Sequence, residues 1–377
     1  MSLDLTLLGS KIAAHRMELS DSLEDVAAAT GVDSKRIAEI EAGKALPTGD
    51  EILILSDHFR CDYKIFLSND PTPNAPPTQI LYRAKNDDFS KEDRRAIRDF
   101  LYLCETEYEL TQELGRITAR FAFTPNGLPK AQAENAALAV RAHLGYQDRE
   151  IARDVYGDCR KLGVHVFRRR LGDSNISGLF IVHPTAGKCI LVNASEDVYR
   201  QRFSAAHELA HALFDSDAVA RVSLRSERQD PLERRANEFA SAYLMPPALL
   251  RQLPDPANWS DDDVKRRAND FRVSCDALGI ALNKARLVSY AQSNHIRGLR
   301  VSHTDKVDPE IPLSLTDSQR RRKSALLEQG LSEHYVSLCF DAHHEGLISA
   351  GRLAEALVPW SNLPGHLNRW KIHHLRS

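Results

Sequence analysis

Two histidines four residues apart, with a glutamate directly after the first, are the residues best suited to chemistry in this chain. They are His207, Glu208 and His211, inside the segment RFSAAHELAHALFD. If the segment is helical, both imidazoles lie on one face and can bind one metal ion. Glu208 is then rotated by about 100° from His207, beside the open coordination position, where it can take a proton from water whose pKa zinc lowers. The pattern predicts a zinc site with Glu208 as general base; the alternative is a buried helix whose histidines only satisfy core hydrogen bonds.

A zinc site of this kind needs a third protein ligand, and a helix predicted over residues 231–246 offers two glutamates. An apolar stripe marks the buried face of that helix: Leu232, Ala236, Phe239, Ala240 and Tyr243. Glu233 lies beside the stripe and faces inward, where a carboxylate needs a partner such as a metal ion. Glu238 lies on the polar face instead. We therefore predict Glu233 as the third ligand, with Glu238 as the weaker candidate and a solvated Glu233 as the alternative.

The elements that must position these residues are a small sheet and a surrounding set of helices. Strands are predicted at Val164–Arg168, Gly178–Val182 and Cys189–Asn193, and the turn-rich sequence HPTAGK joins the last two. Helices are predicted over residues 130–143 and 148–162 before the sheet, and helical patterns dominate after it. The predicted fold class is therefore α+β, mostly helical, with a small β-sheet.

The first 68 residues have the pattern of a separate module of five short helices. Ser22 with Asp25 is a capping pair that opens the second helix, and Gly31 allows the positive φ of a tight turn. Asp33 or Ser34 caps the third helix, SKRIAEIEAG. The remaining helices are predicted at residues 5–17, 50–59 and 62–67. A glycine turn between the second and third of five helices is typical of a helix-turn-helix domain.

The third of these helices would be the recognition helix, and its exposed positions include Ser34, Lys35 and Arg36, with Lys44 on the same side. Residues 1–70 hold seven Lys and Arg residues against thirteen Asp and Glu residues, a net charge of −6. Because phosphate contacts supply most non-specific affinity for DNA, an acidic module begins at a disadvantage. We predict DNA binding through the local basic cluster. The alternative is a helix-turn-helix fold reused for dimerisation or for docking a protein partner.

A proline-rich segment follows the module, with prolines at Pro71, Pro73, Pro76 and Pro77. Four prolines cannot continue a helix, so residues 69–79 are predicted to be an extended linker. A charged, mostly helical connecting region is predicted at residues 80–127, with one long helix over residues 91–121. The domain that holds the candidate metal site spans residues 128–290, and a helical C-terminal region spans residues 291–377.

The composition excludes several classes of protein. The chain has 377 residues, of which 42% are hydrophobic and 27% charged, as is ordinary for a globular protein. No apolar run approaches the ~18 residues of a membrane span, and no signal peptide is apparent. Six scattered cysteines without a CxxC pair indicate reduced thiols. We expect a cytoplasmic protein with no membrane partner, and the net charge of −2 argues against coating nucleic acid by bulk electrostatics.

These segments resemble those of the ImmA/IrrE zinc metallopeptidases. The resemblance rests on GLFIV, RQRFSAAHELAHALF and LERRANEFASAYLMP, and it extends to FRVSCDALGIALNKARLVS. It implies a zincin-like domain with one zinc ion per chain, held by His207, His211 and Glu233, with Glu208 as the general base. It also implies an N-terminal XRE-type helix-turn-helix domain, although Leu23 stands where relatives usually have a glutamine that helps to clamp DNA. Members of the family commonly cleave a partner repressor or antitoxin-like protein, which switches transcription.

Together these inferences predict a regulatory zinc-dependent endopeptidase joined to a helix-turn-helix domain. Its expected substrate is a repressor or antitoxin-like protein encoded nearby, DNA is a candidate partner through residues 1–68, and a homodimer is left open. One alternative is a non-enzymatic transcription regulator whose metallopeptidase-like domain senses a metal or ligand, or holds a protein partner. A second alternative is a protease that binds no DNA and uses the N-terminal module to recognise its substrate.

Overall fold

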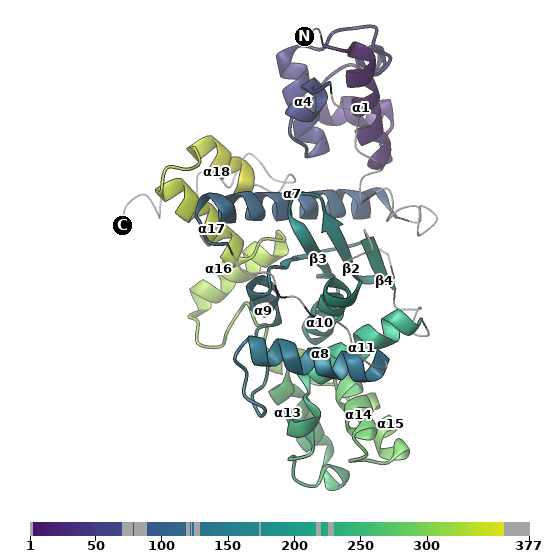
Figure 1. The fold of residues 1–377 in the computed structure, drawn as a ribbon, viewed down its shortest axis with the longest axis vertical. Helices are drawn as coiled ribbons and strands as arrows, with labels where there is room; N and C mark the ends of the chain where they lie inside the picture. Colours follow the sequence, from purple (N-terminus) through teal and green to yellow (C-terminus); the bar gives the residue numbers. More distant parts are fainter. Residues whose placement is uncertain are drawn as a thin grey trace. The chain divides into compact units, whose positions relative to one another are not determined.

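A computed structural model describes residues 3–69, 78, 89–117, 121, 123, 129–172, 175–215, 220–224 and 230–357 of the chain (Figure 1). The chain forms two compact units, Met1–Leu103 with Leu171–Ser174, and Cys104–Arg170 with Asn175–Ser377. Helix α7 (Lys91–Glu113) contributes residues 91–103 to the first unit and residues 104–113 to the second. Within the described ranges, no helix is long and apolar enough to cross a membrane. Most of the predicted proline-rich linker lies outside the described residues.

The first unit begins with five helices, as the sequence predicts: α1 (Leu5–Glu18), α2 (Leu23–Thr30), α3 (Ser34–Glu41), α4 (Gly49–Phe59) and α5 (Lys64–Leu67). Ser22 and Asp25 form a reciprocal capping box at the start of α2, and Gly31 ends that helix with a φ of 75°. Of the two candidate caps for α3, it is Asp33 whose side chain accepts hydrogen bonds from the backbone N–H groups of Lys35 and Arg36. Local side-chain chemistry therefore sets the start of α2 and α3 and the turn between them.

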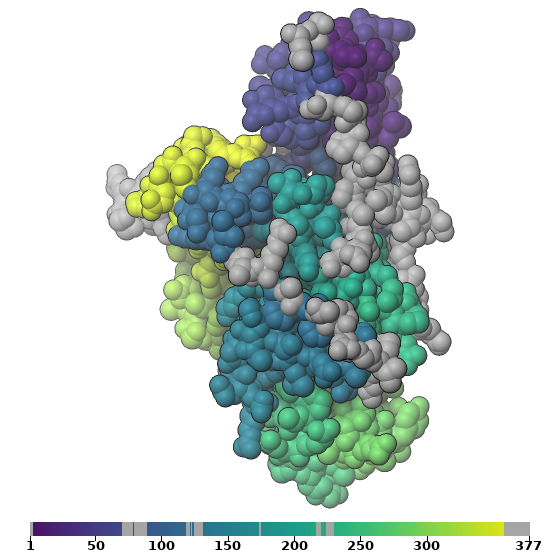
Figure 2. All heavy atoms as spheres, viewed as in Figure 1, coloured from purple at the N-terminus to yellow at the C-terminus, as the bar shows by residue number. Residues whose placement is uncertain are grey.

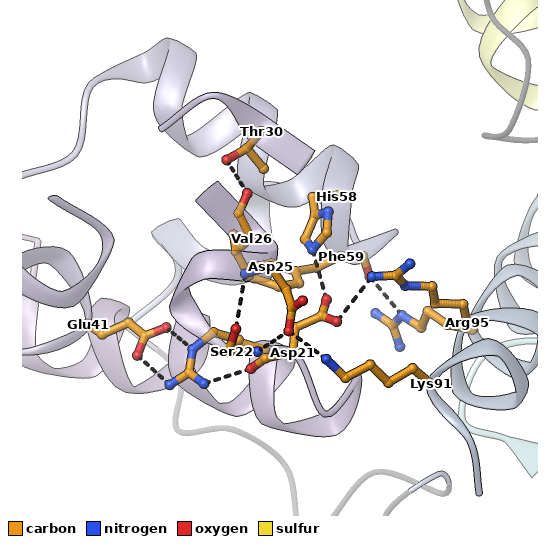
Figure 3. Close-up of polar contacts among 12 residues, drawn as sticks. Asp21, Ser22, Asp25, Val26, Thr30, Glu41, His58, Phe59, Lys91 and Arg95 are labelled. Carbon is orange, nitrogen blue, oxygen red and sulfur yellow. Dashed lines mark hydrogen bonds and ion pairs between the residues drawn. The ribbon is translucent and has the colours of Figure 1, made fainter. Parts of the chain in front are cut away.

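Residues 91–103 of α7 belong to the same unit and are tied to the five helices by basic side chains (Figure 3). Lys91 Nζ lies 2.5 Å from Asp25 Oδ2, and Arg95 Nη2 lies 3.1 Å from Asp21 Oδ1. α1 approaches α3 closely at Gly9, where a Cβ would collide with the carbonyl oxygen of Ile40. The apolar core around this contact consists of Leu8, Ile12, Leu19, Val26, Ile37, Ile40, Ile52, Leu55, Phe59 and Phe66.

The second unit contains a sheet whose described strands have the order β1-β3-β2-β4. The strands are β1 (His165–Arg169), β2 (Ile176–His183), β3 (Gly187–Asn193) and β4 (Ala220–Leu224). β1 pairs with β3 in parallel, whereas β2 pairs with both β3 and β4 in the antiparallel direction. The predicted hairpin is therefore the antiparallel pair of β2 and β3. The fourth strand, β4, is an addition that the sequence analysis missed.

Helices cover this sheet in layers. α10 (Val198–Phe214) packs against β2, β3 and α11 (Pro231–Leu244), and α11 packs in turn against α8 (Pro129–His143). Figure 1 shows α10 between the sheet and these two helices. Residues 104–113 of α7 contact the sheet through two carboxylates, since Glu107 Oε2 lies 2.5 Å from His165 Nδ1 and Glu105 Oε1 lies 3.1 Å from His183 Nε2. α10 is thus the central helix of the second unit.

Further helices complete the second unit. α13 (Asp261–Phe271), α14 (Cys275–Lys284) and α15 (Tyr290–Gly298) form the lower end of the unit in Figure 2. The shorter or more C-terminal helices are α9 (Val155–Lys161), α12 (Pro247–Leu250), α16 (Asp317–Glu328), α17 (Glu333–His344) and α18 (Ala350–Leu357). The predicted α+β, mostly helical fold class with a small sheet is confirmed.

Two predicted helices are shorter than expected. The helix predicted over residues 148–162 is only α9, because arginines from other segments take up the preceding backbone carbonyls: Arg141 donates to the carbonyl oxygens of Gln147 and Glu150, and Arg202 donates to that of Ala152. The helix predicted over residues 91–121 ends at Glu113, and residues 118–120 lie outside the described part. Gly115 has a φ of 65°, which terminates a right-handed helix.

Candidate metal centre

The two histidines and the glutamate between them lie on the most deeply buried helix of the second unit. The side chain of Asp197 caps the start of α10, and the helix then runs between the sheet and α11. His207 is 6% exposed, and Glu208 and His211 are fully buried. α11 brings Glu233, which is 4% exposed, to the same place. Two helices therefore place four ionisable side chains in a nearly water-free environment, where each needs a partner.

The three candidate ligands converge. Glu233 Oε2 lies 3.0 Å from His207 Nε2, Glu233 Oε1 lies 3.2 Å from His211 Nε2, and the two Nε2 atoms lie 3.2 Å apart. Among the residues that the structure describes, these are the one group of three His, Cys, Asp or Glu side chains whose ligand atoms all lie within 4.8 Å of one another. Ligands bound tetrahedrally at zinc distances lie about 3.3 Å from each other. The spacing and the donor types therefore fit a zinc ion.

The outer nitrogens of both imidazoles are also engaged. His211 Nδ1 lies 2.7 Å from Asp215 Oδ2, and His207 Nδ1 lies 3.1 Å from Asn237 Oδ1. The carboxylate of Asp215 can only accept a hydrogen bond, so Nδ1 of His211 carries the proton and Nε2 of the neutral ring keeps its lone pair. With lone pairs on both Nε2 atoms and a carboxylate beside them, the centre of the cluster needs a cation or protons to be stable.

The charges in the cluster shift the pKa values of its members. Burial lowers the pKa of His211, but hydrogen bonds to Asp215 and Glu233 outweigh burial and raise it to about 9. Burial raises the pKa of Glu233, yet the two imidazoles hold it well below its usual range. Without an ion, the cluster therefore favours a carboxylate that shares protons with the histidines. A divalent cation can take the place of those protons.

Glu208 differs from its neighbours because neither of its carboxylate oxygens has a hydrogen-bond partner in the described part of the chain. Its carboxylate lies against β2, since a Cβ on Gly178 would lie 2.9 Å from Glu208 Oε1 and 3.0 Å from its Cγ. Burial raises the pKa of Glu208, against the opposing effects of the two imidazoles and of the nearby Ser223 hydroxyl of β4. An unpaired buried carboxylate with a raised pKa beside a cation site is suited to accept and return a proton.

The second candidate on α11 is placed elsewhere. The carboxylate of Glu238 lies 2.5 Å from Lys284 Nζ on α14, and its side chain is 23% exposed. It is therefore not among the converging ligand atoms. The sequence analysis also missed three residues that surround the cluster, Gly178, Asp215 and Asn237. Helical spacing could have found two of them, because Asp215 follows His211 by four residues and Asn237 follows Glu233 by four.

The candidate DNA-contacting residues on and near α3 have different surroundings. Lys35 and Lys44 are exposed and Ser34 is half-buried. Arg36 instead forms a two-pronged ion pair, with Nε 2.9 Å from Glu51 Oε1 and Nη2 3.0 Å from Glu51 Oε2. A phosphate contact by Arg36 requires this pair to open. Within the described residues, neither lysine has an ion pair of this kind.

Most other basic residues of the first 70 are already engaged within the first unit. Lys11 is 2% exposed and donates hydrogen bonds to the backbone oxygens of Ile65 and Ser68. Arg16 forms an ion pair with Glu41 at 2.7 Å, and Arg60 lies 3.5 Å from Asp99. Lys64 is exposed on α5, with Nζ 3.9 Å from Asp62. Lys35 and Lys44 are therefore the main cations near α3 that phosphate groups can reach.

The fold and the site together define a protein that joins a helix-turn-helix domain to a metallopeptidase-like domain. Residues 159–283 match the peptidase M78 family, described as the IrrE N-terminal-like domain, and residues 12–66 match a helix-turn-helix family. The chain therefore carries an IrrE/ImmA-like peptidase domain and an XRE-type helix-turn-helix domain. The peptidase match indicates metallopeptidase-type activity and covers all of α10 and α11. A comparison with curated proteins finds no match.

Proposed function

We propose that the second unit is a zinc-dependent endopeptidase that cleaves a protein regulating transcription, such as a repressor or antitoxin-like protein encoded nearby. The observation that carries the proposal is the unpaired, fully buried carboxylate of Glu208 beside the three converging ligand atoms. In this proposal His207, His211 and Glu233 hold one zinc ion per chain. Zinc, when bound, acts as a Lewis acid on a peptide carbonyl and lowers the pKa of water.

Other residues of the chain have separate roles in the proposed function. Glu208 accepts a proton from the attacking water and later delivers it to the nitrogen of the leaving amine. Its pKa is raised by burial, which favours acceptance of the proton from water. Gly178 leaves room for this carboxylate against β2. In the same proposal, Ser34, Lys35 and Lys44 of the helix-turn-helix domain are the residues that meet DNA, and Arg36 joins them when its ion pair with Glu51 opens.

The test compares the full chain with its Glu208→Gln variant on the repressor or antitoxin-like protein encoded beside it. The amide keeps the size of the side chain but cannot accept the proton. We expect both proteins to bind one zinc ion and only the native chain to cleave the partner, as measured by metal analysis and mass spectrometry of the products. Cleavage by the variant at the native rate would contradict the mechanism. Zinc binding without cleavage by the native chain would favour a non-enzymatic regulator that senses metal or holds the partner.

A further inference from the structure

Asp215 lies at the end of α10, on the outer side of the candidate metal centre, and is held by basic side chains from two other elements. Its Oδ2 lies 2.7 Å from His211 Nδ1, and its Oδ1 accepts a hydrogen bond from Arg235 Nη2 of α11. Arg221 of β4 adds a third contact, with Nε 3.7 Å from Oδ2. The side chain of Asp215 is 10% exposed. This carboxylate is therefore fixed on several sides.

Arg235 is itself well anchored. Its guanidinium lies over the ring of Phe214 at 4.5 Å from the centroid, and its side chain is 14% exposed. A planar guanidinium stacked on an aromatic face and bonded to a carboxylate has little freedom to reorient. Because Arg235 follows Glu233 by two residues on α11, one helix supplies a candidate ligand and also anchors the residue behind another ligand.

The contact between Asp215 and His211 determines the tautomer and the orientation of the His211 ring. A carboxylate only accepts hydrogen bonds, so it keeps the proton of the neutral ring on Nδ1 and leaves the lone pair on Nε2. It also fixes the rotation of the ring, which places Nε2 at 3.2 Å from Glu233 Oε1. Residues behind a ligating histidine act in this way in metal sites, where their loss lowers metal affinity by about 10- to 100-fold.

We infer that Asp215, clamped by Arg235, is a positioning residue that orients His211 for metal binding. The inference rests on the proposed function, in which His207, His211 and Glu233 hold zinc. If the inference holds, metal affinity depends on two successive contacts, from Arg235 of α11 to Asp215 and from Asp215 to His211 of α10. Asp215 touches neither substrate nor reacting atoms in this scheme, because it acts through the imidazole.

The experiment measures zinc affinity of the full chain by competition with a chromophoric chelator. Asp215→Ala should lower the affinity by about 10- to 100-fold, and Asp215→Asn should lose less because its amide oxygen can still accept the Nδ1 proton. Arg235→Lys, which keeps the charge but loses the planar fork, should give a smaller loss than Asp215→Ala. Asp276→Asn is the matched control, since it removes an exposed ion pair with Arg297 at 2.7 Å in the same unit.

A spectroscopic readout separates orientation from general destabilisation. Substitution with Co²⁺ reports ligand geometry, so Asp215→Ala should change the visible absorption spectrum while Asp276→Asn leaves it unaltered. If Asp215→Ala does not fold, Asp215→Asn and Arg235→Lys provide the same comparison. Native affinity and a native cobalt spectrum in the Asp215 variants would overturn the inference. A His211→Ala variant separates this failure from a failure of the proposed function. If His211→Ala lowers zinc affinity while the Asp215 variants do not, only the inference about Asp215 fails. If His211→Ala binds zinc as well as the native chain does, the proposed zinc site fails too.

Discussion

Replacing Lys35 and Lys44 together with alanine tests how far the first unit can bind DNA through charge. These lysines are exposed, whereas Arg36 is paired with Glu51 at 2.9 Å and Lys11 is buried. Each neutralised phosphate contributes about −0.9 to the slope of log K against log salt concentration. Two lysines therefore predict a slope of about −1.8. With this slope, the affinity for DNA falls about 12-fold between 50 and 200 mM salt. A protein that makes six to ten phosphate contacts would lose ~10³- to 10⁵-fold in affinity over the same range of salt.

The assay is fluorescence anisotropy of a labelled duplex with the full chain over that range of salt. The double variant should have a slope shallower by about 1.8 than the native chain. Lys64→Ala is the matched control, because it removes an exposed lysine of α5 and should leave the slope unchanged. Arg36→Ala should also have little effect while the pair with Glu51 is closed. The reasoning is refuted if the double variant keeps the native slope, or if Arg36→Ala reduces the slope more than the double variant does.

Two further changes test the packing around Glu208 and the acid stability of the first unit. Gly178→Ala should displace the carboxylate of Glu208, at an overpacking cost of about 1–3 kcal/mol in stability. We therefore expect cleavage of the partner to fall at least ~10-fold, while zinc affinity is unchanged. A loss of zinc binding would contradict this explanation. Burial raises the pKa of Glu18, but the hydrogen bond to His15, the charge of Arg98 and the hydrogen bond to Thr78 lower it to about 2, from an ordinary value of 4.5. Because the folded-state pKa is the lower one, the stabilisation is complete above about pH 4.5 and is lost as the pH falls towards 2, up to roughly 3 kcal/mol. The protection of α1–α5 against hydrogen exchange, taken relative to the intrinsic exchange rate at each pH, should therefore fall more steeply on acidification in the native chain than in Glu18→Gln, and equal acid sensitivity would argue against the shift.

The parts of the fold that could be predicted from the sequence are those set by local chemistry. The capping box of Ser22 and Asp25 and the left-handed Gly31 mark the boundaries of α2 without any tertiary information. The apolar stripe of α11 predicts that Glu233 faces inward, whereas its meeting with His207 depends on the packing of α11 against α10. In these segments, local preference and burial favour the same structure.

The features that escaped prediction depend on contacts between distant segments. Residues 148–154 are not helical because Arg141 and Arg202 satisfy carbonyl groups that a helix would otherwise use. β4 is an exception, because its five residues ARVSL alternate between apolar and polar, a pattern that could have indicated a short strand. The role of Gly178 depends on which residue of β2 meets α10, and the register of a strand cannot be read from its own sequence.

The cluster at the centre of the second unit joins two helices whose contributing residues, His207 and Glu233, are 26 positions apart in the chain. An ion held by both would close a loop in the chain in the same sense as a covalent cross-link. In the chain-entropy account of cross-links, closing a loop of that length removes about 3 to 4 kcal/mol of conformational freedom from the unfolded ensemble. Metal supply would then govern how long the second unit stays folded, since a chain that loses its ion also loses the cross-link between α10 and α11.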